Sequence, residues 1–315
     1  MDNNINVKLL SMAGQGGSIF GISLMNTMKE RDDIMVLSSD MSTPAGLDKF
    51  KATYPDHFMN VGIAEQNMIG IAAGLTDEGF RTVCVAQACF ITMRSFEQVR
   101  QYCGYMKTPL ILVGIGSGLS LQYMGNTHYA IEDIALMRTI PGMTVIAPCD
   151  SLEAIKAFEF AIHHDGPVYI RLFGGTSIPS VYNEDYNYIA GKSVSLREGK
   201  DIDIITTGSM VGVAIKVADA LVEDGVCASV INMHTLKPID VSSISSDKKL
   251  IVTLEEHSII GGLGDAVISC SDHKHKVLKI GINDRYVPVG SYPYMLEQCG
   301  LKVEQIKNQI INKLK

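Results

Sequence analysis

A single carboxylate lies at the start of an apolar stretch with helical spacing. No charged residue occurs within the six positions on either side of Glu65. A buried, unpaired carboxylate favours its protonated form, and it can then donate a hydrogen bond to a ring nitrogen or carry a proton. The alternative is an exposed glutamate on a first helical turn, where it stabilises the helix dipole. The residues expected on the buried face of this helix are Ile63, Met68, Ile71, Ala72 and Leu75.

The elements around Glu65 alternate between short apolar strands and helices. This pattern predicts a parallel sheet that is covered on both faces. Sites in such sheets lie at the carboxyl ends of the strands, where Asp40, residues 86–94, Gly116 and Arg171 fall. The expected strands are residues 35–40, 82–86, 109–115, 144–148 and 167–171, and the expected helices are residues 15–30, 63–77, 131–139 and 151–164.

A second unit follows a break in the pattern. Residues 174–199 are rich in Gly, Ser, Pro, Asn and Tyr, which is typical of a domain boundary. The expected elements beyond it are strands at 203–207, 228–232 and 249–254 and helices at 210–223 and 303–314. We predict an α/β protein with two mainly parallel sheets flanked by helices. The predicted division is a first domain over residues 1–180, a linker over 181–198 and a second domain over 199–315.

Composition narrows the class of protein. The chain has 315 residues, 46% of them hydrophobic, and a net charge of −7 with acids and bases interspersed. This balance argues against a nucleic-acid partner or a polybasic membrane surface. The absence of a membrane-length apolar run and of a signal-peptide pattern predicts a cytoplasmic protein. Seven cysteines without metal-ligand spacing are interpreted as free thiols, and no metal ligand is expected in this chain.

The nine residues Asn60 to Met68, with the sequence NVGIAEQNM, resemble the pyrimidine-binding domain of the transketolase family. The resemblance implies that Glu65 is catalytic and hydrogen-bonds the aminopyrimidine ring of thiamine diphosphate. It covers nearly the whole chain and matches the C-terminal half of a transketolase, which comprises the pyrimidine-binding and C-terminal domains. Further matching segments are residues 40–43, 90–100, 125–138, 254–257 and 261–264.

The resemblance also implies a set of cofactor contacts. Phe90 is expected to stack on the aminopyrimidine, because an aromatic face suits a flat cationic ring. Counting from Arg94, some family members place that aromatic residue one position later, where this chain has Ile91. Arg94 belongs to the same cofactor-facing segment. Met41 is expected as an apolar contact of the cofactor, and Asp40 as an acid near its polar side.

Two residues are implied on the substrate side. His128 matches a position that faces the reactive carbon of the cofactor, where it could stabilise an oxyanion or move a proton. Arg171 matches a position that binds a substrate phosphate. The alternatives are a structural histidine and, for Phe90, an ordinary core residue.

Three positions depart from the family pattern. A substrate-side histidine of the family falls on Gly116, an acid that binds a sugar hydroxyl falls on Met124, and a phosphate-binding serine falls near Pro44. Cofactor chemistry is thus expected to be kept while sugar recognition is changed. An unusual donor or acceptor is implied, such as a modified, larger or unphosphorylated sugar.

The chain lacks the Gly-Asp-Gly loop and downstream Asn that hold the diphosphate and its divalent metal in this family. Gly264-Asp265-Ala266 is not accepted as a substitute, because it lies in the second domain without the downstream Asn. We therefore expect a partner chain, the N-terminal diphosphate-binding subunit, to hold Mg²⁺ or Ca²⁺ and to share the thiamine diphosphate in an α2β2 assembly. The expected function is the small subunit of a split transketolase that transfers a two-carbon ketol unit between sugars or sugar phosphates. The alternatives are the β subunit of a 2-oxoacid dehydrogenase, a deoxyxylulose-phosphate-synthase-like enzyme, and a non-catalytic scaffold subunit.

Overall fold

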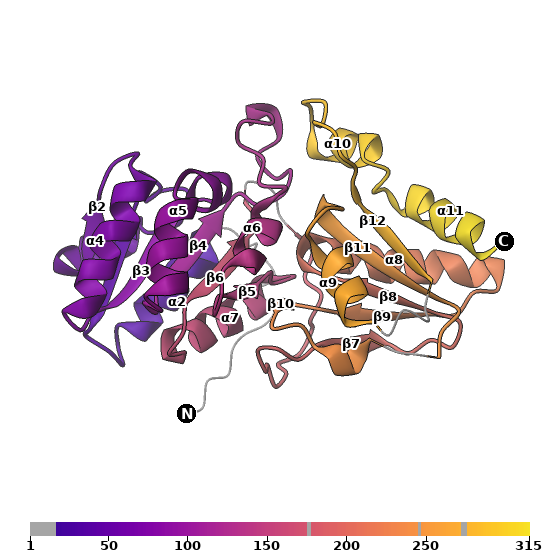
Figure 1. Ribbon diagram of the computed structural model, residues 1–315, viewed down its shortest axis with the longest axis horizontal. Helices are drawn as coiled ribbons and strands as arrows, with labels where there is room; N and C mark the ends of the chain where they lie inside the picture. Colours follow the sequence, from indigo (N-terminus) through magenta and orange to yellow (C-terminus); the bar gives the residue numbers. More distant parts are fainter. Residues whose placement is uncertain (1–16, 175–177, 245–246, 272–275) are drawn as a thin grey trace.

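Two mainly parallel sheets organise the chain, one in each half of the sequence (Figure 1). The computed structural model describes residues 17–174, 178–244, 247–271 and 276–315. Within these ranges the predicted fold class is confirmed. The apolar runs form the central strands, and they are buried over their full length because helices cover both faces.

The first sheet has seven strands in the order β10-β5-β6-β4-β3-β1-β2, and every pair is parallel except β10 with β5. Its middle strands correspond closely to the runs expected from the sequence. Their bounds are β1 Ile34–Ser38, β2 Phe58–Asn60, β3 Arg81–Gln87, β4 Ile111–Ile115, β5 Thr144–Ile146, β6 Val168–Leu172 and β10 Thr235–Lys237.

Helices cover both faces of this sheet. One face packs against α4 (Glu65–Asp77), α5 (Phe96–Val99) and α6 (Asp133–Thr139). The other packs against α2 (Gly17–Thr27), α3 (Asp48–Thr53) and α7 (Ser151–His163). On α4, Met68 and Ala72 are buried as expected, but Ile63 is 73% exposed because it precedes the helix. The predicted helix 15–30 begins partly outside the described residues.

The second sheet has five strands in the order β12-β11-β8-β9-β7, with β7 antiparallel to β9. Its strands are β7 Val194–Arg197, β8 Ile202–Thr206, β9 Ala228–Asn232, β11 Leu250–Ser258 and β12 Val277–Ile282. Its helices are α8 Val211–Leu221, α9 Leu263–Cys270, α10 Tyr292–Gln298 and α11 Val303–Leu314. Strand β7 lies inside the predicted linker 181–198, so the irregular segment is shorter than the sequence predicts.

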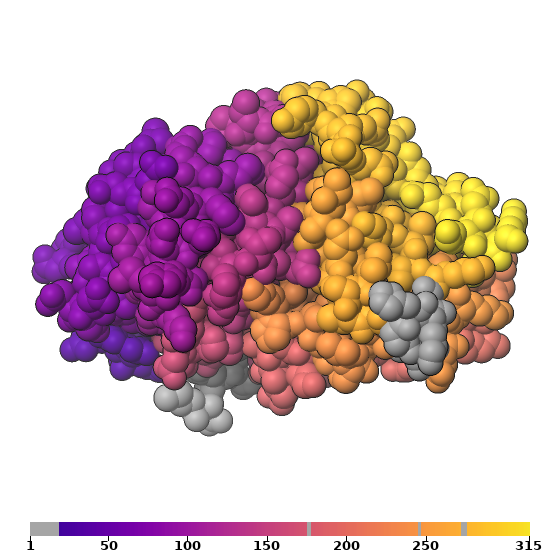
Figure 2. Space-filling view, in the orientation of Figure 1, coloured from indigo at the N-terminus to yellow at the C-terminus, as the bar shows by residue number. Residues whose placement is uncertain are grey.

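The two halves share an apolar core. One hydrophobic cluster contains Met137 and Tyr169 from the first half together with Ile231, Ile251 and Val267 from the second. Strand β10, which follows β9 in the chain, leaves the second sheet and pairs with β5 at the edge of the first. The halves therefore meet in a continuous seam, and the space-filling view shows them in contact on the visible face (Figure 2).

Candidate active site

Side chains from three segments meet at the carboxyl edge of the first sheet. Glu65 begins α4, Phe90 and Arg94 lie in the segment that follows β3, and His128 lies in the loop that follows β4. Three contacts link these four residues one after another in space. Glu65 forms an ion pair with Arg94, Arg94 stacks on the Phe90 ring, and the Phe90 ring contacts His128. Parallel strands bring their following loops to one edge, which explains how residues 63 positions apart come together.

Glu65 is buried at the first helical position of α4, with only 2% of its surface exposed. The turn that precedes it is fixed by Ser39, whose hydroxyl donates to Gly62 O at 2.8 Å and accepts from Ala64 N at 3.2 Å. The prediction of a buried carboxylate holds in the structure, but the prediction that it is unpaired is wrong. Arg94 Nη1 lies 2.7 Å from Glu65 Oε2.

Arg94 connects the carboxylate to an aromatic ring. Its guanidinium carbon lies 4.0 Å from the centroid of the Phe90 ring. Its side chain is 41% exposed, so this flat cation lies at the open side of the site. Arg94 thus makes a hydrogen bond to Glu65 and a stack on Phe90, which are the two contacts predicted for a cationic aminopyrimidine.

His128 is the fourth member of the cluster and contacts the Phe90 ring. The two ring centroids are 5.3 Å apart and the planes meet at 68°, which is an edge-to-face contact. His128 Nδ1 lies 2.9 Å from Thr127 Oγ1. Among the described residues Nε2 has no hydrogen-bond partner, so it is the ring nitrogen available to a ligand.

The structure shows that Phe90, and not Ile91, is placed to contact a ligand in the site. Residues Phe90–Arg94 form a π-helical turn, which changes the direction of successive side chains relative to an α-helix. Phe90 is half-buried beside Arg94 and His128, whereas Ile91 is fully buried in the core under the sheet. Ile91 is therefore removed from the predicted cofactor contacts, since the core surrounds its side chain.

Asp40 and Met41 lie at the adjacent strand end, after β1. Asp40 has a positive φ of 54° and is exposed, and its Oδ1 accepts from Asn60 Nδ2 at 3.2 Å. Met41 is half-buried, and its backbone N–H donates to Ser38 Oγ at 2.9 Å. Both residues are at the predicted edge of the sheet.

Arg171 does not lie in this cluster. It is 4% exposed, and its Nε donates to Asp133 Oδ2 at 2.8 Å. Its Nη2 donates to Ala130 O and to Glu256 O, both at 3.0 Å. These contacts hold the guanidinium inside the seam between the two halves, so the prediction that Arg171 binds a substrate phosphate is not supported by its position.

The seam around Arg171 contains a second set of ionisable groups that sequence reasoning did not identify as a cluster. Burial lowers the pKa of His257 to about 4, so the imidazole is neutral, accepts from Ala135 N and donates from Nδ1 to Ser258 O. Burial raises the pKa of Glu255 to about 7, and hydrogen bonds from Gly264 N and Leu263 N oppose that rise. The only sequence signal is a charged run, Glu255-Glu256-His257, at the end of an apolar strand.

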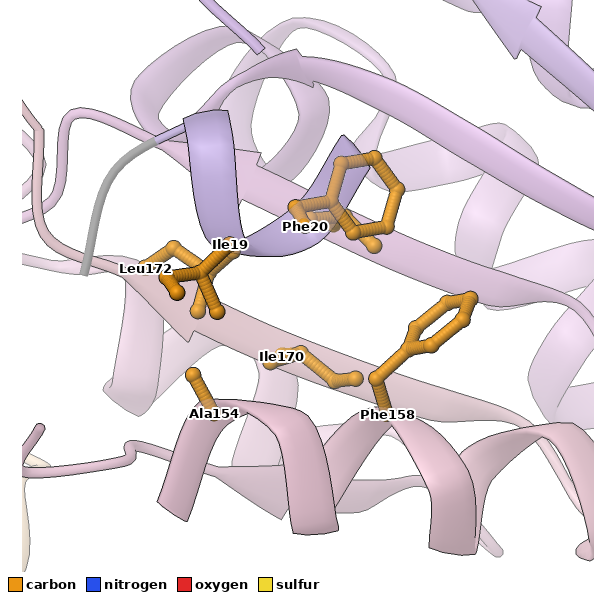
Figure 3. Close-up of a pocket in the computed structure, with 7 residues that line it drawn as sticks. Ile19, Phe20, Ala154, Phe158, Ile170 and Leu172 are labelled. Carbon is orange, nitrogen blue, oxygen red and sulfur yellow. The ribbon is translucent and has the colours of Figure 1, made fainter. Parts of the chain in front are cut away.

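The enclosed cavity in Figure 3 is not a candidate site. It lies between α2, α7 and the first sheet, and its volume is about 10 Å³, which leaves room for no more than one water molecule. Figure 3 shows that the side chains around it are apolar, so it offers no group that could bind a polar ligand. Its lining residues are Ile19, Phe20, Val113, Ala154, Phe158, Ile170 and Leu172.

Two properties of the described part of the chain bear on other classes of function. Within residues 17–174, 178–244, 247–271 and 276–315, none of the helices has both the length and the apolar character needed to cross a bilayer. The same ranges hold no group of three or more His, Cys, Asp or Glu side chains placed to bind a metal ion.

Comparison with known families identifies both halves of the chain. Residues 17–173 match the family model for the transketolase pyrimidine-binding domain, and residues 191–306 match that for the transketolase C-terminal domain. The fold and this pair of matches define a two-domain protein of the thiamine diphosphate-dependent class. The pyrimidine-binding domain implies thiamine diphosphate as the coenzyme.

Relatives agree with this class. The chain is 34% identical over 292 residues to one of the subunits of the apulose-4-phosphate transketolase of Phocaeicola vulgatus, covering 91% of this chain and 93% of the relative. It is 35% identical over 291 residues to the SqwH subunit of the 6-deoxy-6-sulfo-D-fructose transketolase of Clostridium sp. strain MSTE9, covering 90% of both chains. A solved split-gene transketolase, described as an inactive β4 tetramer, superposes with a TM-score of 0.85 at 34% identity and covers 96% of this chain and 98% of that one.

The chain therefore belongs to the transketolase family. It carries the pyrimidine-binding and C-terminal domains and corresponds to one subunit of a split enzyme. The resemblance found in the sequence is confirmed.

Proposed function

We propose that this chain is the small subunit of a split transketolase, which transfers a two-carbon ketol unit from a ketose to an aldose acceptor. The observation that carries the proposal is the cluster of Glu65, Arg94, Phe90 and His128 at the carboxyl edge of the first sheet. When bound, thiamine diphosphate supplies the carbanion chemistry that breaks and forms the carbon–carbon bond. The chain itself supplies binding, orientation and control of protons.

The residues of the cluster fit the aminopyrimidine end of that coenzyme. Glu65 has one strong partner, and its carboxylate can accept or donate at a ring nitrogen according to its protonation. Phe90 offers an aromatic face of the size of the pyrimidine. Because Arg94 contacts both Glu65 and Phe90, we propose that it swings aside, or turns to the edge of the ring, when the coenzyme binds. Its exposed position leaves room for that movement.

His128 acts on the substrate side in this proposal. It is half-buried, and Nε2 is directed away from the Thr127 contact made by Nδ1. An imidazole held in this way can donate to a developing oxyanion or pass a proton at Nε2. Asp40 and Met41 are proposed as further cofactor contacts, since both lie at the neighbouring strand end.

A partner chain completes the site. The sequence lacks the Gly-Asp-Gly loop and downstream Asn that hold the diphosphate and its Mg²⁺ or Ca²⁺ in this family. Two similar proteins are named as subunits of transketolases, which supports a separate diphosphate-binding chain. We propose that this partner holds the metal and that the active assembly is an α2β2 heterotetramer with sites between unlike chains.

Sugar recognition is proposed to differ from that of ordinary transketolases. Gly116 has a φ of +81°, and a Cβ there would lie 3.0 Å from Leu121 side-chain atoms, so a histidine on this backbone would be strained. Met124, which replaces the sugar-binding acid, is 48% exposed. The two named relatives act, by their names, on apulose 4-phosphate and on a sulfonated fructose. We propose a non-standard sugar or sugar phosphate as the substrate here also.

The test is reconstitution with a partner chain that carries a Gly-Asp-Gly segment and a downstream Asn, to be sought first in the neighbouring reading frame. The complex is supplied with thiamine diphosphate, Mg²⁺ and a panel of ketose donors with aldose acceptors. Ketol transfer to an aldose supports the proposal. Decarboxylation of a 2-oxoacid without ketol transfer would favour the 2-oxoacid dehydrogenase alternative, and condensation of pyruvate with an aldehyde would favour the deoxyxylulose-phosphate-synthase alternative.

A further inference from the structure

We propose that Asn126 and Glu256 are positioning residues that fix the His128 loop against the second domain. The loop comprises residues 116–130, which follow β4. This role of the two residues rests on the function proposed for His128. It means that the second domain, which contributes none of the proposed cofactor contacts, sets the position of a catalytic side chain in the first.

The tip of the His128 loop is a tight turn, so a change in the position of Asn126 also changes the position of His128. Gly125 O accepts from His128 N at 2.9 Å and from Tyr129 N at 3.2 Å. Gly125 has a φ of +78°, which favours glycine at this position. Asn126 and His128 are therefore parts of one rigid hydrogen-bonded unit.

Asn126 clamps this turn to the second domain through a reciprocal pair of hydrogen bonds. Its Nδ2 donates to Val287 O at 2.9 Å, and its Oδ1 accepts from Val287 N at 3.0 Å. Val287 is buried and lies between β12 and α10. A side-chain amide donates and accepts at once, so it can pair with both polar atoms of one backbone residue in the way that a neighbouring strand would.

Glu256 holds the base of the same loop. Its Oε1 accepts from Leu119 N at 2.7 Å, and its Oε2 accepts from Ser209 Oγ and Tyr292 Oη, both at 2.5 Å. Gly118 packs against this carboxylate so closely that no Cβ could be accommodated. Gly118 and Ala130 exchange backbone hydrogen bonds of 2.9 and 3.2 Å, which closes the loop at its two ends.

Between the tip and the base, Tyr129 anchors the loop in the core of the second domain. Its ring belongs to that domain's hydrophobic cluster, and its hydroxyl contacts Met295 Sδ of α10 at 2.9 Å. In Figure 1 this segment rises beside α10, away from the remainder of the first half. On the first-domain side, the His128 ring makes its edge-to-face contact with Phe90. The spacing between His128 and the Glu65–Phe90 pair thus depends on the seam.

The test compares Asn126→Ala with Arg138→Met. Both remove side-chain hydrogen bonds across the seam, because Arg138 Nη1 donates to the backbone carbonyls of Gly261 and Gly262. Only Asn126 connects to the His128 loop. In the isolated chain labelled at histidine with ¹³C and ¹⁵N, the His128 imidazole signal, assigned from its loss in His128→Gln, should shift and broaden in Asn126→Ala. It should keep its wild-type position in Arg138→Met, and the His57 and His163 signals should stay in place in both variants.

In the reconstituted complex, Asn126→Ala should lower kcat by about 10-fold to 100-fold with little change in KM, because misplacement of a group by an ångström costs about that much. Asn126→Asp keeps the acceptor for Val287 N but turns a carboxylate oxygen toward Val287 O, so it should not restore the wild-type kcat. Glu256→Gln, where it folds, should shift the same His128 signal. An unmoved His128 signal in Asn126→Ala, or a moved signal with unchanged kcat, would overturn the proposal. A complex that shows no ketol transfer with any donor would refute the proposed function. The position of the His128 imidazole signal would still decide whether Asn126 and Glu256 position the loop.

Discussion

Glu65 and Glu256 are both buried to within 2% of their surface, but their surroundings differ. Glu256 accepts three hydrogen bonds from a backbone N–H and two hydroxyls. Within the described ranges Glu65 has one partner, and that partner is an arginine with 41% of its side chain exposed. A carboxylate has room for about four hydrogen bonds. The carboxylate with three hydrogen bonds therefore stabilises the seam, whereas the carboxylate with more remaining capacity is the one that can bind a ligand.

The two arginines that pair with carboxylates show the same contrast. Arg171 is enclosed and donates to Asp133 and two backbone carbonyls, whereas Arg94 covers Phe90 at the mouth of the site. The seam is thus a fixed polar network, and the cluster around Glu65 is a set of groups with exchangeable contacts. Four substitutions test this contrast.

The largest effect is expected for Glu65→Gln in the reconstituted complex. The amide cannot exchange a proton with a ring nitrogen, so we expect turnover to fall by about 10³-fold or more, near the upper range for removal of a general acid–base group. The chain should remain folded, because glutamine has nearly the same shape. Glu78→Gln, at the exposed C-terminal end of the same helix, is the matched control and should keep wild-type turnover.

Arg171→Met should have the next largest effect, and it should be on stability. Removal of one partner from a buried ion pair leaves an uncompensated charge on Asp133 and costs about 3–5 kcal/mol of the free energy of unfolding. Urea denaturation of the isolated chain measures this. A variant with wild-type stability but weakened binding of a sugar phosphate in the complex would restore the substrate-binding role predicted from the sequence.

Glu153, on α7, accepts from Asn232 Nδ2 of β9 at 2.8 Å and so belongs to the polar contacts of the seam. Glu153→Gln should change how stability depends on pH. Burial raises the pKa of Glu153 to about 7 from its ordinary value of 4.5, so the folded wild type keeps a proton that the unfolded chain releases over this range. Wild-type stability therefore loses a contribution as the pH rises from 4.5 to 7. Between pH 4.5 and pH 7, the free energy of unfolding of the variant should rise by on the order of 3 kcal/mol relative to that of the wild type. The hydrogen bonds lost in the variant add a difference that does not change with pH.

Thermal or urea unfolding from pH 4 to pH 8 measures this difference. Glu184→Gln is the control, since this glutamate is exposed on the nearby linker segment and its difference from wild type should stay flat. If the difference in the free energy of unfolding between Glu153→Gln and wild type did not change with pH, the folded protein would not disfavour the charged form of Glu153 relative to the unfolded chain.

Arg94→Met should have the smallest effect on stability, because 41% of the Arg94 side chain is exposed and solvent screens its attraction to Glu65 more than it screens the enclosed Arg171–Asp133 pair. Urea denaturation beside Arg171→Met gives the direct comparison. If Arg94→Met proved as destabilising as Arg171→Met, the cluster around Glu65 would be a structural ion pair of the same kind as the seam.

Much of the fold could be predicted from the sequence, and the reasons are physical. Inner strands such as β1 and β4 are nearly continuous apolar runs, so their length and composition identify them. Strands β7 and β10 have only three or four residues and gain their order from pairing with distant strands. A single sequence carries no local signal for such pairing, which is why β7 falls within the predicted linker.

The sequence predicts the residues of the site but not their pairings. Helical spacing and the family resemblance point to Glu65, yet its partner Arg94 is 29 positions away on another element. The π-helical turn decides between Phe90 and Ile91, and its geometry is not visible in residue types. Arg171 ends a strand as predicted, but whether a strand end faces a site or a neighbouring domain depends on the seam.

The central claim is that this chain holds only the pyrimidine half of a coenzyme site. Calorimetric titration of thiamine diphosphate with Mg²⁺ into this chain, into the diphosphate-binding partner and into their equimolar mixture tests it most directly. The account predicts no saturable binding by this chain alone, stoichiometric binding by the mixture, and clearly weaker binding when the mixture contains Glu65→Gln. Stoichiometric binding of the coenzyme and metal by this chain alone would contradict it.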